Sequence, residues 1–175
     1  MPTNAKTKAK KTAERKAAPK RGAVAKKSEA MNAVALLEAD HREVEELFDE
    51  YEDTEEDTRK LELAQQICMA LTVHTTIEEE IFYPAARAAT KDNDLLDEAA
   101  VEHAGAKKLI AEIKAGKPGD DLYDAKVKVL SEQIKHHVKE EETELFPECE
   151  SAKMDLDAVG AQLAKRKSAL MKQTA

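Results

Sequence analysis

Apolar side chains recur every three or four residues along most of this chain, the spacing that places them on one face of an α-helix. The pattern starts at Ala30 and predicts a first helix over residues 30–52. A second predicted helix, over residues 61–84, should end or kink at Pro84, because proline lacks the amide hydrogen that a helix interior uses. A third runs through residues 96–110 and stops at the Gly- and Pro-containing residues 116–119, and a fourth covers residues 122–147.

Four helices joined by short links predict an all-α fold, an up-and-down antiparallel four-helix bundle over residues 30–150. Residues 156–171 repeat the amphipathic pattern, so residues 151–175 should add a C-terminal helix or tail on the outside of the bundle. Residues 1–28 contain almost no large apolar side chain and cannot offset the entropy lost on ordering. They should form a disordered Lys/Ala-rich arm.

Charge divides the chain in the same way. The net charge is −8, but residues 1–28 hold ten Lys or Arg against Glu14 alone, so this arm carries +9 and the remainder −17. Its Lys-Ala-Pro composition resembles the tails of linker histones, which favours non-specific contact between residues 6–27 and the phosphates of nucleic acid. The alternatives are docking of the arm on the acidic body and, less favoured, an organellar transit peptide.

Other features restrict location and chemistry. No apolar run approaches the roughly 20 residues that span a bilayer, and the basic start lacks the apolar stretch of a secretory signal, so no membrane partner is expected. Cys68 and Cys149 form no CxxC motif. We expect Cys68 to be buried and Cys149 to lie on the surface, and two unpaired thiols suit a reducing cytoplasm. The sequence shows no nucleophile, general base or phosphate-binding loop, so any catalysis must be metal chemistry, and enzymatic activity stays an open question.

The second and fourth helices contain a repeat. His74 and His137 each precede a glutamate by four residues, Glu78 and Glu141, and a proline by ten. Four residues are about one helical turn, so each His and Glu lie on one face, and that face is otherwise apolar. Because a buried, uncompensated carboxylate costs several kcal/mol, the pair of glutamates predicts a shared pair of metal ions.

The first and third helices each place one histidine, His41 and His103, on a similar apolar face. Four imidazoles and two carboxylates suit iron, and manganese or zinc less well. A single histidine on such a face is more often a satisfied core residue, but four in four consecutive helices make coincidence improbable. A ferritin-like site would need Glu-x-x-His on two helices, and only Glu38 to His41 has that spacing.

These motifs resemble hemerythrin-type (HHE) cation-binding domains over about residues 32–150: Asp40-His41, His74-x-x-x-Glu78, Glu102-His103 and His137-x-x-x-Glu141. The resemblance implies two non-haem irons with histidine ligands, bridging carboxylates Glu78 and Glu141, and an open position for O₂, peroxide or NO. Glu142 is an alternative bridge. Lys107 stands where the family usually has a further ligand, which disfavours reversible O₂ carriage unless Glu45 or another group replaces it.

Two functions follow as hypotheses. The first is a di-iron protein that binds, senses or scavenges O₂, peroxide or NO. The second is an iron- or oxygen-responsive module without turnover, possibly tethered to nucleic acid by the arm. The remaining polar residues of the repeat are expected on the solvated face: His136, Glu79, Glu80, Glu140 and Glu144.

Overall fold

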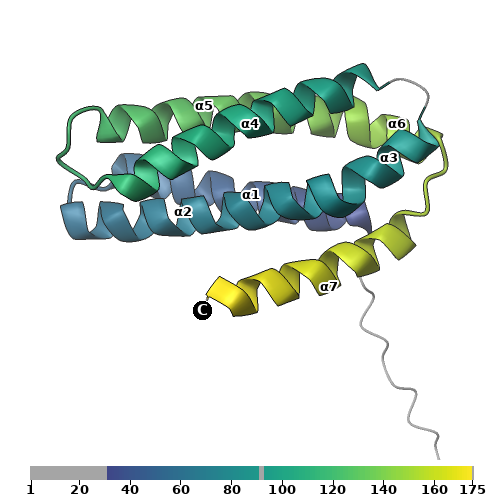
Figure 1. The fold of residues 1–175 in the computed structure, drawn as a ribbon, viewed down its shortest axis with the longest axis horizontal. Coiled ribbons are helices and arrows are strands. Elements are labelled where there is room, and N and C mark those ends of the chain that lie inside the picture. The colour runs from purple at the N-terminus through teal and green to yellow at the C-terminus, as the bar shows by residue number, and fades with distance from the viewer. Residues whose placement is uncertain (1–30, 91–92, 175) are drawn as a thin grey trace, which may run out of the picture.

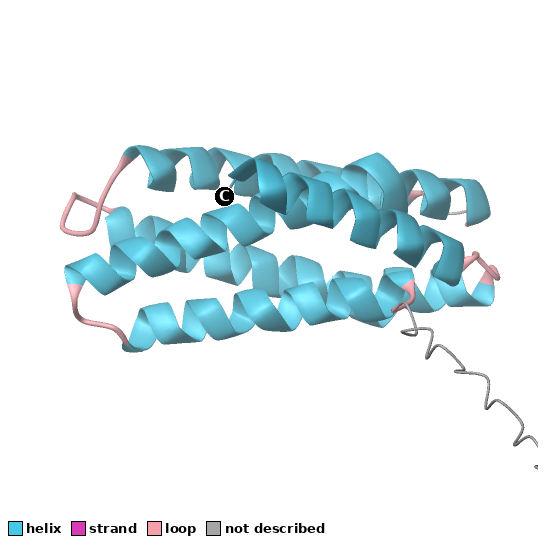
Figure 2. Cartoon of the chain, turned by 90° about the horizontal axis from the view of Figure 1, so that it is seen from below, coloured by secondary structure: helices cyan, strands magenta, loops and turns pink. Residues whose placement is uncertain are grey.

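A computed structural model describes residues 31–90 and 93–174 of the chain. Four long helices form the predicted antiparallel bundle (Figure 1): α1 (Ala33–Asp53), α2 (Asp57–Ile77), α4 (Asp94–Ala115) and α5 (Tyr123–Glu140). Helices α2 and α5 continue through the π-helical segments η1 (Glu78–Phe82) and η2 (Glu141–Leu145) into the short helices α3 (Tyr83–Ala89) and α6 (Phe146–Ser151). The described residues contain helices and loops without strands (Figure 2), and the basic arm lies outside them.

Local side-chain contacts set where the helices begin. The Asn32 side chain accepts a hydrogen bond from the amide of Ala35 and starts α1. The Glu56 carboxylate accepts from the amides of Thr58 and Arg59, so α2 begins at Asp57, before the predicted residue 61. A carboxylate at a helix N-terminus satisfies free amides and complements the helix dipole, which explains this early start.

The second helix does not end at Pro84, because α3 runs through this proline to Ala89, and the fourth helix likewise continues past Pro147. In both, a π turn precedes the proline, and the proline then occupies the first turn of the next α-helix, where no amide donor is needed. The amide of Tyr83 bonds to the carbonyl of Glu78, five residues earlier. Each π turn therefore inserts one extra residue directly after the glutamate of the repeat.

The apolar core consists of two clusters at opposite ends of the bundle. One gathers Leu37, Phe82 and Phe146, and the other Phe48 and Leu130, all almost fully buried. The buried histidines and glutamates belong to neither cluster. The site is therefore a polar layer with apolar packing on both sides.

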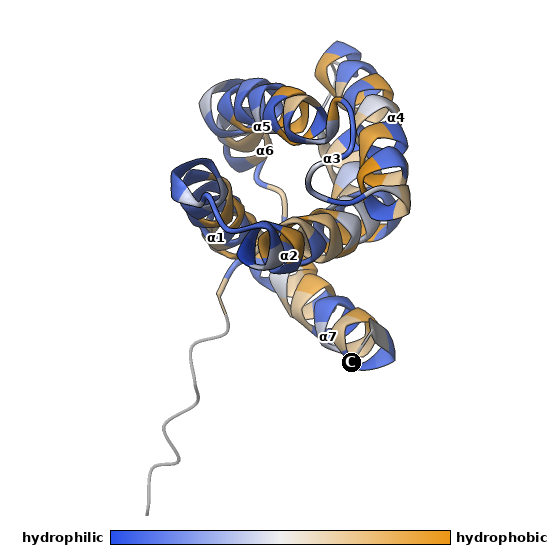
Figure 3. Ribbon diagram, turned by 90° about the vertical axis from the view of Figure 1, so that its left-hand side faces the viewer, coloured by the Kyte–Doolittle hydropathy of each residue, from blue (hydrophilic) through white to orange (hydrophobic). Residues whose placement is uncertain are grey.

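The last helix, α7 (Leu156–Thr174), lies outside the bundle against α1 and α2, as the end-on view shows (Figure 3). Leu163 is fully buried in this interface. A Cβ atom on Gly160 would lie 2.6 Å from the carbonyl oxygen of Met31, so only glycine permits this close approach to the start of α1. Among the described residues, no helix is long and apolar enough to cross a membrane.

Cys149 is buried, which corrects the prediction of a surface thiol; Cys68 is buried as expected. Because α6 extends the fourth helix beyond Pro147, Cys149 is carried into the core cluster around Phe146. Burial raises the pKa of both thiols to about 11.

We expect both thiols of the native protein to react with Ellman's reagent at pH 8 at least about a hundredfold more slowly than free cysteine, because few thiolates form at that pH. Unfolding in guanidinium should release two fast-reacting thiols per chain. The absorbance of the released thiolate measures both rates. Fast reaction of Cys149 in the folded protein would contradict its placement in the core.

Candidate metal centre

The six residues predicted to bind metal meet in the middle of the bundle. All are at least 94% buried: His41, His74, Glu78, His103, His137 and Glu141. Each long helix supplies one histidine, and the glutamates occupy the first position of each π segment. Two groups of closely spaced donor atoms result, and Glu78 belongs to both.

The donor atoms form two pairs joined by carboxylates. The Nε2 atoms of His41 and His74 are 3.2 Å apart, and those of His103 and His137 are 3.1 Å apart. Glu78 Oε2 lies 3.1 Å from His74 Nε2 and 3.5 Å from His103 Nε2. Glu141 Oε2 lies 3.3 Å from His41 Nε2 and 3.5 Å from His137 Nε2. Each carboxylate thus contacts one imidazole of each pair.

This arrangement fits two bound cations. Two donor atoms at about 2.1 Å from one metal ion are roughly 3.0 to 3.4 Å apart, for bond angles between 90° and tetrahedral. Within the described part of the chain, both oxygens of Glu78 and Oε2 of Glu141 have no hydrogen-bond donor. Because unpartnered buried carboxylates are costly, their oxygens and the facing Nε2 lone pairs need a cation between them.

A second set of carboxylates surrounds the imidazoles from outside. Each Nδ1 atom faces one: His41 faces Glu142 at 2.9 Å, His103 faces Glu79 at 3.1 Å, His137 faces Glu102 at 2.7 Å, and His74 faces Asp40 at 3.6 Å. An ionised carboxylate only accepts hydrogen bonds, so the three close Nδ1 atoms carry hydrogen and donate. The Nε2 lone pairs are thereby directed into the centre, as in histidine ligands of metals.

Three of the outer carboxylates are paired with cationic side chains. Arg42 contacts Glu142, Lys107 Nζ lies 2.6 Å from both oxygens of Glu79, and Lys167 of α7 contacts Asp40. Together six carboxylates surround four imidazoles and these three cations, an excess of three negative charges when the imidazoles are neutral. Two divalent cations would offset that excess.

The pKa values show the same demand for positive charge. Burial by itself would lower the pKa of His74, but the carboxylates of Glu78 and Asp40 raise it to about 10. Burial likewise opposes protonation of His137, yet Glu141 raises its pKa. For Glu141, burial favours the neutral acid, but His41 and the other neighbouring imidazoles hold its pKa below the usual range. Burial lowers the pKa of His103, so the carboxylates favour the protonated form at His74 and His137 and not at every imidazole of the layer.

Tyr83 is a site residue that the sequence analysis missed. Its hydroxyl donates to Glu141 Oε1 at 2.9 Å and lies 3.2 Å from His103 Nε2. Tyr83 lies nine residues after His74, so in an unbroken α-helix it would point to the opposite side. The π turn adds a residue and brings Tyr83 to the side of the helix that carries Glu78. The equivalent residue of the repeat is Phe146, which stacks on His41 at 6.0 Å. The two halves of the centre therefore differ in one hydroxyl.

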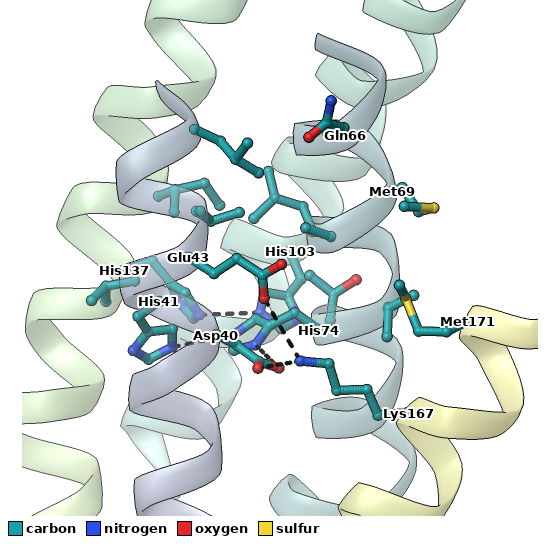
Figure 4. Close-up of a pocket in the computed structure, with 18 residues that line it drawn as sticks. Asp40, His41, Glu43, Gln66, Met69, His74, His103, His137, Lys167 and Met171 are labelled. Atoms are coloured by element: carbon teal, nitrogen blue, oxygen red, sulfur yellow. Dashed lines mark hydrogen bonds and ion pairs between the residues drawn. The ribbon is translucent and has the colours of Figure 1, made fainter. Parts of the chain in front are cut away.

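A cavity of about 110 Å³ reaches the histidines between α1 and α2, beneath α7. Its walls are mainly apolar, with Val44, Leu47 and Ile134 among them. Figure 4 shows Lys167, a lining residue from α7, directed toward Asp40 and Glu43 on α1. Small, weakly hydrated molecules fit such a passage better than ions do.

Several secondary predictions need correction. Glu142 lies outside the imidazole of His41, so it is not placed as an alternative bridge. Glu79 is exposed, as expected for the solvated face, and it also contacts His103. Lys107 points away from the centre and pairs with Glu79. Glu45 pairs with Arg42, so it does not take the place of the ligand that the family usually has at position 107. The other residues assigned to the solvated face are exposed or half-buried: His136, Glu80, Glu140 and Glu144.

Comparison with known proteins identifies relatives of the chain. Residues 32–149 match the model of the hemerythrin HHE cation binding domain family. A DNA nickase from Nostoc sp. (strain PCC 7120 / SAG 25.82 / UTEX 2576) is 32% identical over 116 residues, 66% of this chain and 33% of that protein. The chain thus spans about a third of the length of this relative. A crystal structure of a hemerythrin HHE cation binding domain-containing protein from Mycobacterium kansasii shares the fold, with a TM-score of 0.69 and 21% identity, covering 82% of this chain and 89% of the other.

Two adjacent histidines provide a test of the site. His137 is buried with Nε2 in the centre, whereas His136 is 59% exposed in its side chain. We expect His137→Ala to lose at least half of the bound metal and to lower the melting temperature by roughly 5 °C, because metal binding stabilises the folded state. His136→Ala, the matched control, should keep metal and stability near the parent. Elemental analysis and thermal unfolding measure both, and equal losses would show that the assignment of His137 is incorrect.

Proposed function

Because the chain belongs to the hemerythrin HHE cation-binding family, we propose that its buried cluster holds two non-haem iron ions. His41 and His74 would bind one ion, His103 and His137 the other, and Glu78 and Glu141 would bind both. The supporting observation is that each glutamate contacts one imidazole of each pair. Mixed imidazole and carboxylate donors favour iron; manganese or zinc are the less favoured occupants.

The proposed role is binding, sensing or scavenging of O₂, peroxide or NO. When bound, the iron pair would supply redox and Lewis-acid chemistry to such ligands. The chain's own residues would contribute in three ways. Three of the outer carboxylates hold the tautomers of the imidazoles they contact, and the apolar layers exclude water. The Tyr83 hydroxyl places a proton donor between Glu141 and His103. A cytoplasmic location would suit the two unpaired thiols.

A second candidate is an iron- or oxygen-responsive module without turnover that acts at nucleic acid. Two observations favour it. The relative from Nostoc is a DNA nickase three times as long as the matched region, so a related domain occurs within a larger protein. Residues 6–27 supply the basic arm that non-specific phosphate contact requires.

Metal analysis and spectroscopy test the di-iron proposal. Protein purified aerobically from iron-replete cells should contain close to two irons per chain and show ligand-to-metal charge-transfer absorption in the near ultraviolet. Glu78→Gln removes a shared charge and should lower the iron content, while exposed Glu144→Gln should leave it unchanged. One zinc per chain without iron would contradict the proposal.

Rapid mixing of the reduced protein with O₂ or H₂O₂ separates the two roles. Repeated spectral cycles in the presence of excess reductant would support scavenging. Iron-dependent thermal stabilisation without such cycles would support the responsive module.

Deletion of residues 1–28 tests the arm. We expect iron content and helicity to stay unchanged and retention on duplex DNA to fall. For the full chain, binding should weaken steeply with salt, with a slope of about −0.9 per phosphate contact, because each contact releases a counterion. Fluorescence anisotropy over a salt series measures this slope. No binding of the full chain at low salt would exclude a nucleic-acid role for the arm.

A further inference from the structure

One of the four outer carboxylates lacks the kind of partner that the other three have. Those three each contact a Lys or Arg as well as facing a histidine of the centre. Glu102 bonds His137 Nδ1 through Oε2, but in the described part of the chain it forms no ion pair with a Lys or Arg. Its other oxygen, Oε1, faces His136 instead. No Lys or Arg therefore offsets the charge of Glu102.

Three side chains that can bind metal meet on the surface at this point. His136 and Glu140 lie one turn apart on α5, and Glu102 approaches them from α4. His136 Nε2 is 3.2 Å from Glu140 Oε1 and 3.6 Å from Glu102 Oε1. Ligand atoms about 2.1 Å from one ion have these separations at bond angles of roughly 100° and 120°. His136 is exposed and both carboxylates are partly exposed, so water can complete the coordination.

A proton on His136 does not balance this group. The distance of 3.6 Å to Glu102 is too long for a hydrogen bond, so an imidazolium would serve Glu140 alone. Two carboxylates around one imidazolium also leave an excess of one negative charge. A divalent cation with a neutral imidazole balances both carboxylates and contacts all three side chains at once.

The surface group adjoins the buried centre. Glu102 and Glu140 line a narrow cavity of about 10 Å³, which is also lined by His137 and Glu141. Glu141 is almost fully buried, and its Oε2 has no hydrogen-bond donor among the described residues. The cavity has about the space of one water molecule. A dehydrated cation fits it as well, because metal–oxygen distances of about 2.1 Å are shorter than those between hydrogen-bonded oxygens.

We propose that Glu102, His136 and Glu140 form a third, exchangeable site for a divalent cation, through which cations enter the buried centre. One imidazole and two carboxylates suit Fe(II), Zn(II) or Mn(II). The entry role rests on the proposed function, since it requires metal in the centre, whereas the site itself does not. The larger apolar cavity between α1 and α2 is then left to small uncharged ligands, so the two kinds of ligand reach the centre by separate routes.

Zinc uptake tests the site. The full chain is loaded with iron, washed with a chelator to empty exposed sites, and titrated with Zn(II) in a calorimeter. The parent should bind one Zn(II) per chain, and His136→Gln and Glu140→Gln should lose this uptake. Glu132→Gln, which removes an exposed charge one turn before His136, is the matched control and should bind zinc as the parent does. Glu102 stays unchanged because it also holds His137.

The zinc titration separates this inference from the proposed function. No uptake by the parent, or the same uptake in His136→Gln, would overturn the inference alone. If the chain as purified holds no iron, the proposed function fails, but the parent should still bind one Zn(II) more than His136→Gln does.

Loading kinetics test the entry role. Metal-free full chain is mixed with Co(II) and quenched with a chelator at successive times, so that elemental analysis counts only the protected central ions. The parent should load about tenfold faster than His136→Gln, the lower end of the effect of charged clefts on association rates. Both should reach the same final content, because the central ligands are the same, and Glu132→Gln should load at the parent rate. Equal rates in parent and His136→Gln would overturn the entry role, and a lower final content in His136→Gln would contradict the separation of the two sites.

Discussion

Two carboxylates buried in the middle of an apolar bundle are the constraint on which the rest of this structure depends. Glu78 and Glu141 are almost fully inaccessible to water and largely without hydrogen-bond donors. Leaving such charges uncompensated would cost several kcal/mol each, a large part of the stability of a domain of this size. Four imidazoles surround these carboxylates, and together they form a layer between the two apolar clusters. Positive charge in that layer is therefore needed to offset the free-energy cost of burying the two carboxylates.

The sequence predicted the helices and the six central residues because both depend on one periodicity. A histidine and a glutamate four residues apart must share a helical face, and four such faces in an antiparallel bundle must meet. The same periodicity fails beyond Glu78 and Glu141, where the π turns add a residue. The position of Tyr83, the continuation of the helices past both prolines and the burial of Cys149 all follow from that extra residue. A strict 3.6-residue pattern contains no signal for it.

The outer carboxylates were less predictable because their partners lie on other helices. Glu79 and Glu142 follow the central glutamates directly, about 100° around the helix, and in isolation belong to a solvated face. In the bundle they contact His103 and His41 across helix interfaces. Residues adjacent to a buried ligand are thus candidates for its second layer, provided that the packing of neighbouring helices is known.

The internal repeat makes the two halves of the centre nearly equivalent, and its departures from symmetry bear on function. Tyr83 and Phe146 occupy matching positions, so a hydroxyl is available on one side only. Asp40 and Glu102 also match, but Glu102 bonds His137 at 2.7 Å while Asp40 is shared with Lys167. Because the two halves are otherwise alike, these two differences distinguish the surroundings of His74 from those of His103. On the His74 side, Asp40 contacts Lys167 of α7, and on the His103 side the Tyr83 hydroxyl lies 3.2 Å from Nε2.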